Sequence, residues 1–249
     1  MTQLTILTGA SRGLGLALAK RLLAPQHTLL CISRHSNVAL TEQAFNEGGA
    51  LIQWTEDLAQ GAWVSQRLEQ WLSEQMSVNF SSVTLINNAS AVLTAPLSQV
   101  NPDDLARTLR VGLEAPMQLT AVFLRVTATW RAQRKVLNIS SGLARSAMAS
   151  QAAYCAVKAA MDHFTRCVAL EEAIKPNGAQ ICALAPGVID TDMQVQLRSA
   201  DPSVFPDQES FSRLKSSGQL ASPDFTASRV LTYLRRADFG AQAVADIRD

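Results

Sequence analysis

The sequence predicts an α/β protein built on a single doubly wound parallel sheet with helices on both faces. Short, continuously apolar segments alternate along the chain with longer segments in which apolar residues recur every three to four positions. A glycine-rich turn follows the first apolar segment directly and leads into the first helical one. No linker, change of composition or internal repeat divides the 249 residues, so we expect one domain over residues 1–249.

Six strands are expected where the apolar runs lie, with helices between them. The strands cover residues 4–8, 28–33, 50–54, 83–86, 136–139 and 180–184. The helices cover residues 14–23, 59–76, 102–129 and 151–174. Pro25 closes the first helix, and Gly112 and Pro116 interrupt the third.

Residues 187–222 break this alternation. The segment is rich in Ser, Gln and Asp and contains Pro202 and Pro206. A connection of this length inside a compact domain is typical of a lid or a binding segment. It leaves from the carboxyl end of a strand, where open α/β sheets bind their ligands. We therefore expect it to form a substrate loop.

The charge balance and the cysteine count argue against several classes of function. Lys plus Arg number 22 and Asp plus Glu 21, with no basic block, so we expect no nucleic-acid partner. No run of apolar residues is long enough to span a membrane, and the N-terminus lacks the basic region of a secretory signal. The four cysteines and three histidines lack the spacing of a disulfide framework or a metal site. We expect a cytoplasmic protein with no membrane partner and no metal.

Residues 8–15, T-G-A-S-R-G-L-G, predict a binding site for the phosphates of a nucleotide. Gly9 permits the tight turn, Gly13 lets the backbone approach a phosphate, and Gly15 lets the helix pack closely. The helix that follows presents free N–H groups and the positive end of its dipole. The alternative is a glycine-rich turn that binds no ligand.

The end of the second expected strand favours NADP(H) over NAD(H). An NAD-binding protein typically carries Asp or Glu there to hold the ribose 2′-hydroxyl. This chain has Ser33 and Arg34, and the next acidic residue is Glu42. Arg34 and Arg12 are suited to hold a 2′-phosphate through charge-assisted fork contacts. The alternative is that both are ordinary surface arginines.

Tyr154 and Lys158 stand four residues apart at the start of a long expected helix, so they share a face. The pKa of a free tyrosine, about 10, is too high for proton transfer at neutral pH. A lysine ammonium one turn away, together with an oxidised nicotinamide, is expected to lower that pKa. Ser141, at the end of the fifth expected strand, is placed to hydrogen-bond a carbonyl oxygen.

Together these motifs resemble the short-chain dehydrogenase/reductase family, whose members have a Rossmann-type fold. The matching segments are T-G-A-S-R-G-L-G, Asp57-Leu58, N-N-A-S (87–90), I-S-S (139–141), Y-C-A-V-K (154–158) and P-G-V-I-D-T (186–191). The resemblance implies reversible hydride transfer between NADP(H) and a small-molecule carbonyl or alcohol, with Ser141, Tyr154 and Lys158 as catalytic residues. The cofactor site that it implies consists of Gly9, Ser11, Arg12, Gly13, Leu14, Gly15, Arg34, Asp57, Leu58, Asn88, Ala89, Tyr154, Lys158, Pro186, Gly187, Val188, Ile189 and Thr191.

Within the family the chain most resembles the sepiapterin reductase branch, which includes bacterial reductases of aromatic diketones such as benzil. The short length, the segment P-G-V-I-D-T-D-M-Q and the terminal D-I-R-D carry this resemblance. Sepiapterin-type enzymes hold the pterin with an acidic residue near the C-terminus. Asp246 stands at that place, although we expect it to be an exposed tail carboxylate. The family resemblance also implies a homodimer or homotetramer formed through the helices around residues 103–129 and 151–174.

Two positions depart from the family's pattern. Ser90 replaces the last glycine of N-N-A-G. Gly112 stands where the family has an Asn whose backbone carbonyl positions a water that relays protons to the lysine. Because the relay depends largely on the main chain, we expect turnover to be retained with a looser relay.

Three functions stay open at this point. The apolar residues of the expected substrate loop favour an apolar ketone or dicarbonyl; they are Met193, Val195, Leu197, Val204, Phe205 and Phe211. The second is a reductase of another substrate, such as a 3-oxoacyl thioester or a sugar ketone. A thioester reductase that serves an acidic carrier protein is expected to have a basic patch near the cavity, and only Arg198, Arg213 and Lys215 are available to form it. A sensor that binds NADP(H) without turnover is the third, but it has no need of an intact tyrosine and lysine pair.

Overall fold

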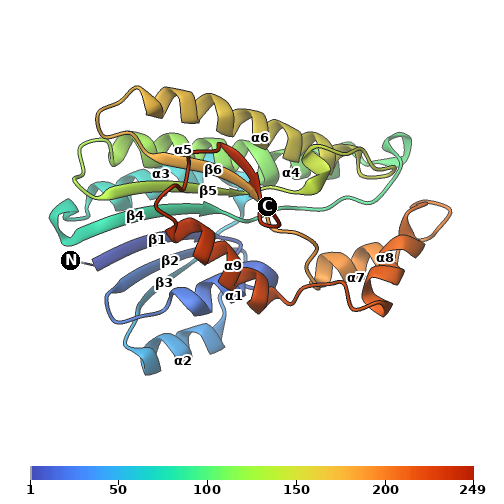
Figure 1. Ribbon diagram of the computed structural model, residues 1–249, viewed down its shortest axis with the longest axis horizontal. Helices are drawn as coiled ribbons and strands as arrows, with labels where there is room; N and C mark the ends of the chain where they lie inside the picture. Colours follow the sequence, from blue (N-terminus) through green and yellow to red (C-terminus); the bar gives the residue numbers. More distant parts are fainter. Residues whose placement is uncertain (1) are drawn as a thin grey trace.

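Seven parallel strands form one sheet in the computed structural model, which describes residues 2–249 (Figure 1). The strands are β1 (Thr2–Thr8), β2 (His27–Ser33), β3 (Ala50–Thr55), β4 (Phe80–Asn87), β5 (Gln133–Ile139), β6 (Gln180–Ala185) and β7 (Val244–Asp246). Their order is β3-β2-β1-β4-β5-β6-β7, and every neighbouring pair is parallel. The order reverses between β1 and β4, the switch point at which such sheets bind ligands. The predicted doubly wound sheet is therefore confirmed.

Helices cover both faces of this sheet (Figure 1). One face carries α1 (Gly13–Leu22), α2 (Val38–Glu47) and α9 (Pro223–Arg235). The other face carries α3 (Gly61–Ser73), α4 (Pro102–Leu109), α5 (Ala115–Val126) and α6 (Ala152–Ala173). Two apolar cores result, one on each face, and the strands contribute side chains to both. This explains why the strands are continuous apolar runs rather than alternating ones.

Outside the expected substrate loop, the sequence prediction missed the helices α2 and α9 and the strand β7. The side chain of Asn37 caps α2 by accepting from the N–H of Leu40 at 2.9 Å, and Gly48 ends the helix with φ of 68°. Ser222 caps α9 in the same way, 3.1 Å from the N–H of Phe225. These are ordinary start and stop signals, so the sequence did contain the evidence for both helices. With three residues, β7 is too short for a periodicity to reveal it.

The expected helix over residues 102–129 consists of three parts. Between α4 and α5 the backbone forms a π-helix over Arg110–Glu114, with Gly112 at its centre. Pro116 falls in the first turn of α5, where the lack of its N–H costs little. π-Helical turns occur often at functional sites, and this one packs against α6. Among residues 2–249, no helix has both the length and the apolar character needed to cross a membrane.

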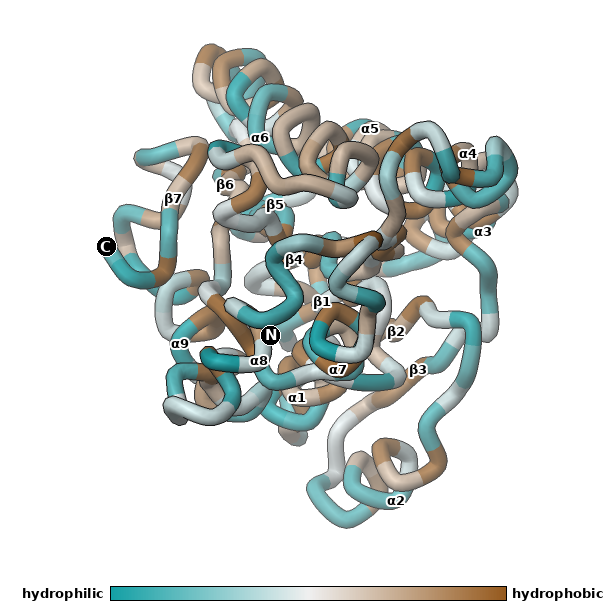
Figure 2. The backbone as a smooth tube through the Cα atoms, turned by 90° about the vertical axis from the view of Figure 1, so that its right-hand side faces the viewer, coloured by the Kyte–Doolittle hydropathy of each residue, from teal (hydrophilic) through white to brown (hydrophobic). Residues whose placement is uncertain are grey.

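The expected substrate loop is largely helical, with α7 (Asp192–Arg198) and α8 (Gln208–Ser216). A bridge between Ile189 and Ala221 closes the base of this segment. Phe205 is fully buried, and its ring centre lies 5.5 Å from that of Phe211 of α8 with a tilt of 46° between the rings, so the two residues pack together within the segment. Figure 2 looks onto the carboxyl ends of the strands and shows α7 and α8 lying in front of them.

His27 is a buried histidine and the first residue of β2, so it lies at the amino-terminal end of the strands, opposite the end that carries α7 and α8. Its Nε2 lies 2.8 Å from the Thr5 hydroxyl oxygen. Burial, assisted by the charge of Arg235, lowers the pKa of His27 from 6.5 to about 4. The folded state therefore binds this proton more weakly than the unfolded chain does.

Between pH 6.5 and about 4 this difference destabilises the protein as the pH falls. We expect the His27 contribution to cost about 2 kcal/mol of unfolding free energy at pH 5 relative to pH 7.5. Urea unfolding at both pH values measures it, and His27→Gln should remove that part of the acid sensitivity. His35→Gln, at an exposed position, is the control. If His27→Gln lost as much unfolding free energy between pH 7.5 and pH 5 as the parent protein does, the prediction would be contradicted.

Candidate active site

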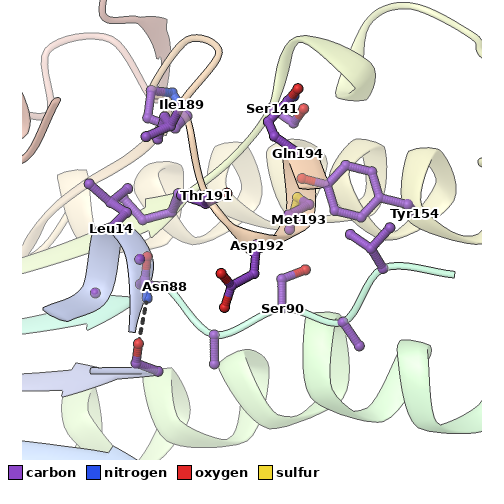
Figure 3. Close-up of a pocket in the computed structure, with 18 of the residues that line it drawn as sticks. Leu14, Asn88, Ser90, Ser141, Tyr154, Ile189, Thr191, Asp192, Met193 and Gln194 are labelled. Atoms are coloured by element: carbon purple, nitrogen blue, oxygen red, sulfur yellow. Dashed lines mark hydrogen bonds between the residues drawn. The ribbon is translucent and has the colours of Figure 1, made fainter. Parts of the chain in front are cut away.

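A cavity of about 1080 Å³ lies at the carboxyl ends of the strands. Every residue that the sequence analysis assigned to catalysis or to the cofactor lines it. These residues come from the glycine turn after β1, from the segments that follow β2 to β6, and from the start of α6. Figure 3 shows Ser141 and Tyr154 on one side of this cavity and Leu14 and Asn88 of the glycine-turn region on the other.

The glycine turn has no room for side chains. Gly9 has φ of +71°, and a Cβ on it would lie 2.9 Å from the Cα of Ala89. A Cβ on Gly15 would lie 2.0 Å from the carbonyl oxygen of Gly9. Arg12 precedes α1 without a capping side-chain bond, so no side chain occupies the first N–H groups of the helix. A bare backbone and uncapped amides fit the phosphates of a dinucleotide.

Thr8 and Asn88 fasten this turn to the end of β4. The Thr8 hydroxyl accepts hydrogen bonds from the backbone N–H groups of Asn88 at 3.0 Å and Ala89 at 3.1 Å. The amide of Asn88 donates to the carbonyl oxygen of Gly9 at 3.2 Å (Figure 3). The N-N-A segment thereby holds the glycine turn in shape.

The two arginines expected to hold a 2′-phosphate have different surroundings. Arg34 is exposed and lines the cavity after β2. Arg12 donates to Asp192 of α7, with 3.0 Å between Nη1 and Oδ2, and both side chains are about 70% exposed. Such an exposed pair stabilises a protein by less than about 1 kcal/mol, so a phosphate competes readily for Arg12.

Asp57, expected at the adenine, is held by a residue that the sequence motifs did not reveal. Its carboxylate accepts from the N–H of Ala59 at 2.9 Å and from Arg107 of α4 at 2.9 Å. Burial acts to raise the pKa of Asp57, but these two donors and the charge of Arg34 outweigh burial and lower the pKa. No motif indicates Arg107, because the pairing joins residues 50 positions apart.

Ser141, Tyr154 and Lys158 meet on one wall of the cavity. Tyr154 and Lys158 lie on the same face of α6, as expected, and both are buried. The Lys158 Nζ donates to the carbonyl oxygen of Ile139, the last residue of β5, at 2.7 Å. The same Nζ lies 5.6 Å from the centre of the Tyr154 ring.

The protonation of these groups is controlled by burial. Burial lowers the pKa of Lys158 to about 8, and the charge of Asp162 opposes that effect. Burial raises the pKa of Tyr154, while a hydrogen bond with Ser141 acts to lower it. In the cofactor-free chain, removal from water is therefore the larger effect on the tyrosine pKa, and the expected lowering by the lysine together with an oxidised nicotinamide stays a prediction.

Asp246 is a correction to the sequence analysis, which expected an exposed tail carboxylate. Asp246 lies in β7, is 7% exposed and lines the cavity. It accepts two hydrogen bonds from the Arg248 guanidinium, at 2.7 and 2.8 Å, and lies 3.8 Å from Arg145. The pairing of β7 with β6 draws the C-terminal segment into the wall of the site.

Gly112 is buried against α6, on which Tyr154 and Lys158 stand. A Cβ at this position would lie 2.6 Å from the Cγ1 of Val157. The family's Asn therefore does not fit unless Val157 moves. Asn138 is no substitute for it, since its amide is bonded to Asn87 and Thr165 within the core.

The loops and the substrate segment contribute apolar side chains to the lining of the cavity, beside polar ones such as Gln194 and Ser210. Among these apolar residues are Val92, Leu143, Met148, Met193, Leu197, Phe211 and Leu214. Three of the six apolar residues expected to face the substrate do so, namely Met193, Leu197 and Phe211. Phe205 does not, because it is fully buried beneath α8. Two buried polar atoms in the wall, Ser90 Oγ and Gln194 Oε1, have no hydrogen-bond partner among residues 2–249.

A parallel sheet whose glycine turn shares one cavity with a serine, a tyrosine and a lysine defines an oxidoreductase of the Rossmann type. The family model for short chain dehydrogenases matches residues 3–202. The chain belongs to the short-chain dehydrogenase family.

Relatives and solved structures agree with this assignment. The chain is 36% identical to the benzil reductase ((S)-benzoin forming) of Bacillus cereus, over 94% of each chain. It is 31% identical to the sepiapterin reductase of Meriones unguiculatus, over 98% of this chain and 95% of the relative. A putative NAD(P)-dependent gluconate 5-dehydrogenase from Beutenbergia cavernae, solved with bound NADP, has the same fold, with a TM-score of 0.82, 23% identity and coverage of 98% and 94%.

The contact between Gly112 and Val157 makes a testable prediction about packing. We expect Gly112→Ala to lower the free energy of unfolding by about 1–3 kcal/mol, because the added methyl group overpacks the π-helix against α6. Gly112→Ala combined with Val157→Ala should cost less than the sum of the two single changes. Chemical unfolding of the four proteins measures the coupling.

Gly142→Ala is the matched control, since no atom lies within 4 Å of a Cβ built there. Strict additivity of Gly112→Ala and Val157→Ala would show that the two positions do not constrain each other.

Proposed function

We propose that the protein is an NADPH-dependent carbonyl reductase that acts on apolar ketones and dicarbonyls of the benzil or sepiapterin type. The placement of Ser141, Tyr154 and Lys158 on one wall of the cavity, opposite the glycine turn, carries this proposal. The relatives named benzil reductase and sepiapterin reductase support it.

The glycine turn, Asp57 and the 186–191 segment would hold the dinucleotide, with Arg12 and Arg34 at its 2′-phosphate. When bound, NADPH supplies the hydride that reduces the carbonyl carbon. The apolar side chains that line the cavity favour carbonyl substrates with aromatic or aliphatic groups.

Tyr154 is the general acid of the proposed reaction. Its raised pKa keeps the phenol protonated at neutral pH, which is the state that ketone reduction requires. Ser141 donates a hydrogen bond to the carbonyl oxygen, and Tyr154 gives that oxygen a proton as negative charge develops on it. The Lys158 ammonium, 5.6 Å from the ring, stabilises the phenolate that Tyr154 becomes.

A reductase that serves an acidic carrier protein receives less support. Arg198 and Lys215 both pair with Asp190, and Arg213 pairs with Glu209. The three basic residues of the substrate segment are thus largely neutralised within the segment itself. A sensor without turnover is the second alternative, and the hydrogen bond from Lys158 to Ile139 together with the closeness of Lys158 to the Tyr154 ring favours a working site over a sensor.

We further propose a cytoplasmic homodimer or homotetramer. The helices expected to assemble expose apolar side chains: Met117 on α5, and Leu170 and Ile174 at the end of α6. All four cysteines are unpaired, which fits a reducing compartment. Light scattering of the purified protein measures the oligomer.

The first experiment follows NADPH oxidation with benzil, sepiapterin, a 3-oxoacyl thioester and simple ketones. We expect turnover with a dicarbonyl, and a loss of about 100- to 10,000-fold in Tyr154→Phe, because the general acid is removed. Tyr233→Phe is the matched control, since Tyr154 and Tyr233 are the chain's two tyrosines. NADPH binding without oxidation of any substrate would favour the sensor instead.

A separate prediction concerns cofactor choice. We expect Arg34→Ala, and more so the double variant with Arg12→Ala, to raise the KM for NADPH about 10- to 100-fold and to leave that for NADH unchanged. Arg131→Ala, at an exposed position outside the cavity, is the control. If the KM for NADH rose as much as the KM for NADPH, the arginines would not be binding the 2′-phosphate.

A further inference from the structure

Asp162 is a buried carboxyl group in α6 that the proposed mechanism does not use. Its side chain is only 2% exposed. One oxygen, Oδ1, accepts a hydrogen bond from the hydroxyl of Ser140. The other, Oδ2, is buried and has no hydrogen-bond partner among residues 2–249. Burial of a half-satisfied carboxylate is costly, so its presence calls for a reason.

Asp162 and Lys158 hold the same short piece of chain. They stand one helical turn apart on one face of α6. Lys158 donates to the carbonyl oxygen of Ile139, and Asp162 accepts from the side chain of the next residue, Ser140. The residue after that is Ser141. The helix that carries Tyr154 is therefore hydrogen-bonded to Ile139 and Ser140, the two residues that precede Ser141.

Three cations act on Asp162, namely Arg145, Arg166 and Lys158, and Lys158 is the buried one. On α6 the neighbouring cations are Lys158 and Arg166; on the turn after β5 it is Arg145. Arg166 is exposed and Arg145 is partly exposed, so water screens both. On β6 the Cys182 thiol is neutral, because burial raises its pKa to about 11.

The nearest acidic group of the adjoining β7 does not disturb this arrangement. Asp246 is paired with Arg248 and faces Arg145. Of the three cations that act on Asp162, Lys158, which is 3% exposed, is the one that shares its buried surroundings and balances its negative charge.

We propose that Asp162 is a positioning residue of the reductase site, which holds Ser141 in place through Ser140 and keeps Lys158 protonated through its negative charge. The proposal deepens the proposed function and rests on it. Burial lowers the pKa of Lys158 to about 8, and the charge of Asp162 acts in the opposite direction. Loss of that charge would lower the lysine pKa further and leave part of Lys158 neutral near pH 7.

Lysine titration in the cofactor-free protein tests the electrostatic part directly. The chain has five lysines, so ¹³C labelling of their Cε atoms gives a simple NMR spectrum, in which Lys158→Arg assigns the signal of Lys158. We expect Asp162→Asn, whose amide can still accept from Ser140, to lower the titration midpoint of Lys158 by about one pH unit or more. Asp238→Asn, at an exposed carboxylate beside Arg236, is the matched control.

Ser140→Ala supplies a second, milder variant should Asp162→Asn fail to fold. Burial raises the pKa of Asp162, and the Ser140 hydrogen bond acts to lower it, so removal of that hydrogen bond raises the pKa further and weakens the negative charge of the carboxyl group. We expect a midpoint for Lys158 between those of the parent protein and of Asp162→Asn. Midpoints in both variants within about a third of a pH unit of the Asp238→Asn value would overturn the proposal.

Activity supplies the second readout. With the substrate found above, we expect the alkaline limb of kcat/KM to move to lower pH in Asp162→Asn by the same amount as the lysine midpoint. Ser140→Ala should lower kcat at every pH, because Ser141 loses its support. A protein without reductase activity would still give the NMR result, so failure of the proposed function and failure of this proposal are distinguishable.

Discussion

The hydrogen bond from Lys158 to the carbonyl oxygen of Ile139 is the contact on which the candidate site depends. It joins the helix that carries Tyr154 to the end of the strand that carries Ser141, across 19 positions of the chain. Lys158 is buried, and a buried ammonium is tolerated only when it is hydrogen-bonded and balanced. The carbonyl oxygen of Ile139 accepts the hydrogen bond, and the carboxylate of Asp162 balances the positive charge. Removal of either would loosen the geometry between serine and tyrosine.

The rest of the cavity is organised around the reversal of strand order between β1 and β4. The glycine turn after β1 forms the floor, and the amide of Asn88 after β4 fixes its shape. The substrate segment lines the other side, where Phe211 of α8 packs on the buried Phe205 and borders the cavity. The segment thus adds both apolar and polar side chains to the wall of the cavity.

The departures from the family's pattern fit the packing of this chain. Gly112 sits so close to Val157 that a side chain there would push against the residue before Lys158. The glycine therefore leaves room for Val157 of α6, which a side chain at position 112 would displace. Ser90 places a hydroxyl in the cavity wall without a protein partner among residues 2–249, where a larger or charged group would be costly.

The sequence by itself determined the doubly wound sheet, the glycine turn and the shared face of Tyr154 and Lys158. Each depends on local rules: apolar periodicity, the freedom of glycine, and the four-residue turn of a helix. The helices α2 and α9 could also be predicted from the sequence, because Asn37 and Ser222 are typical N-capping residues, although apolar periodicity alone did not indicate these helices. Tertiary structure decided the rest. Contacts between segments far apart in the chain bury Asp246. Such contacts also pair Asp57 with Arg107 and Arg12 with Asp192. They set the pKa values of Tyr154 and Lys158 as well. Desolvation and long-range pairing are properties of the packed molecule, and no local pattern encodes them.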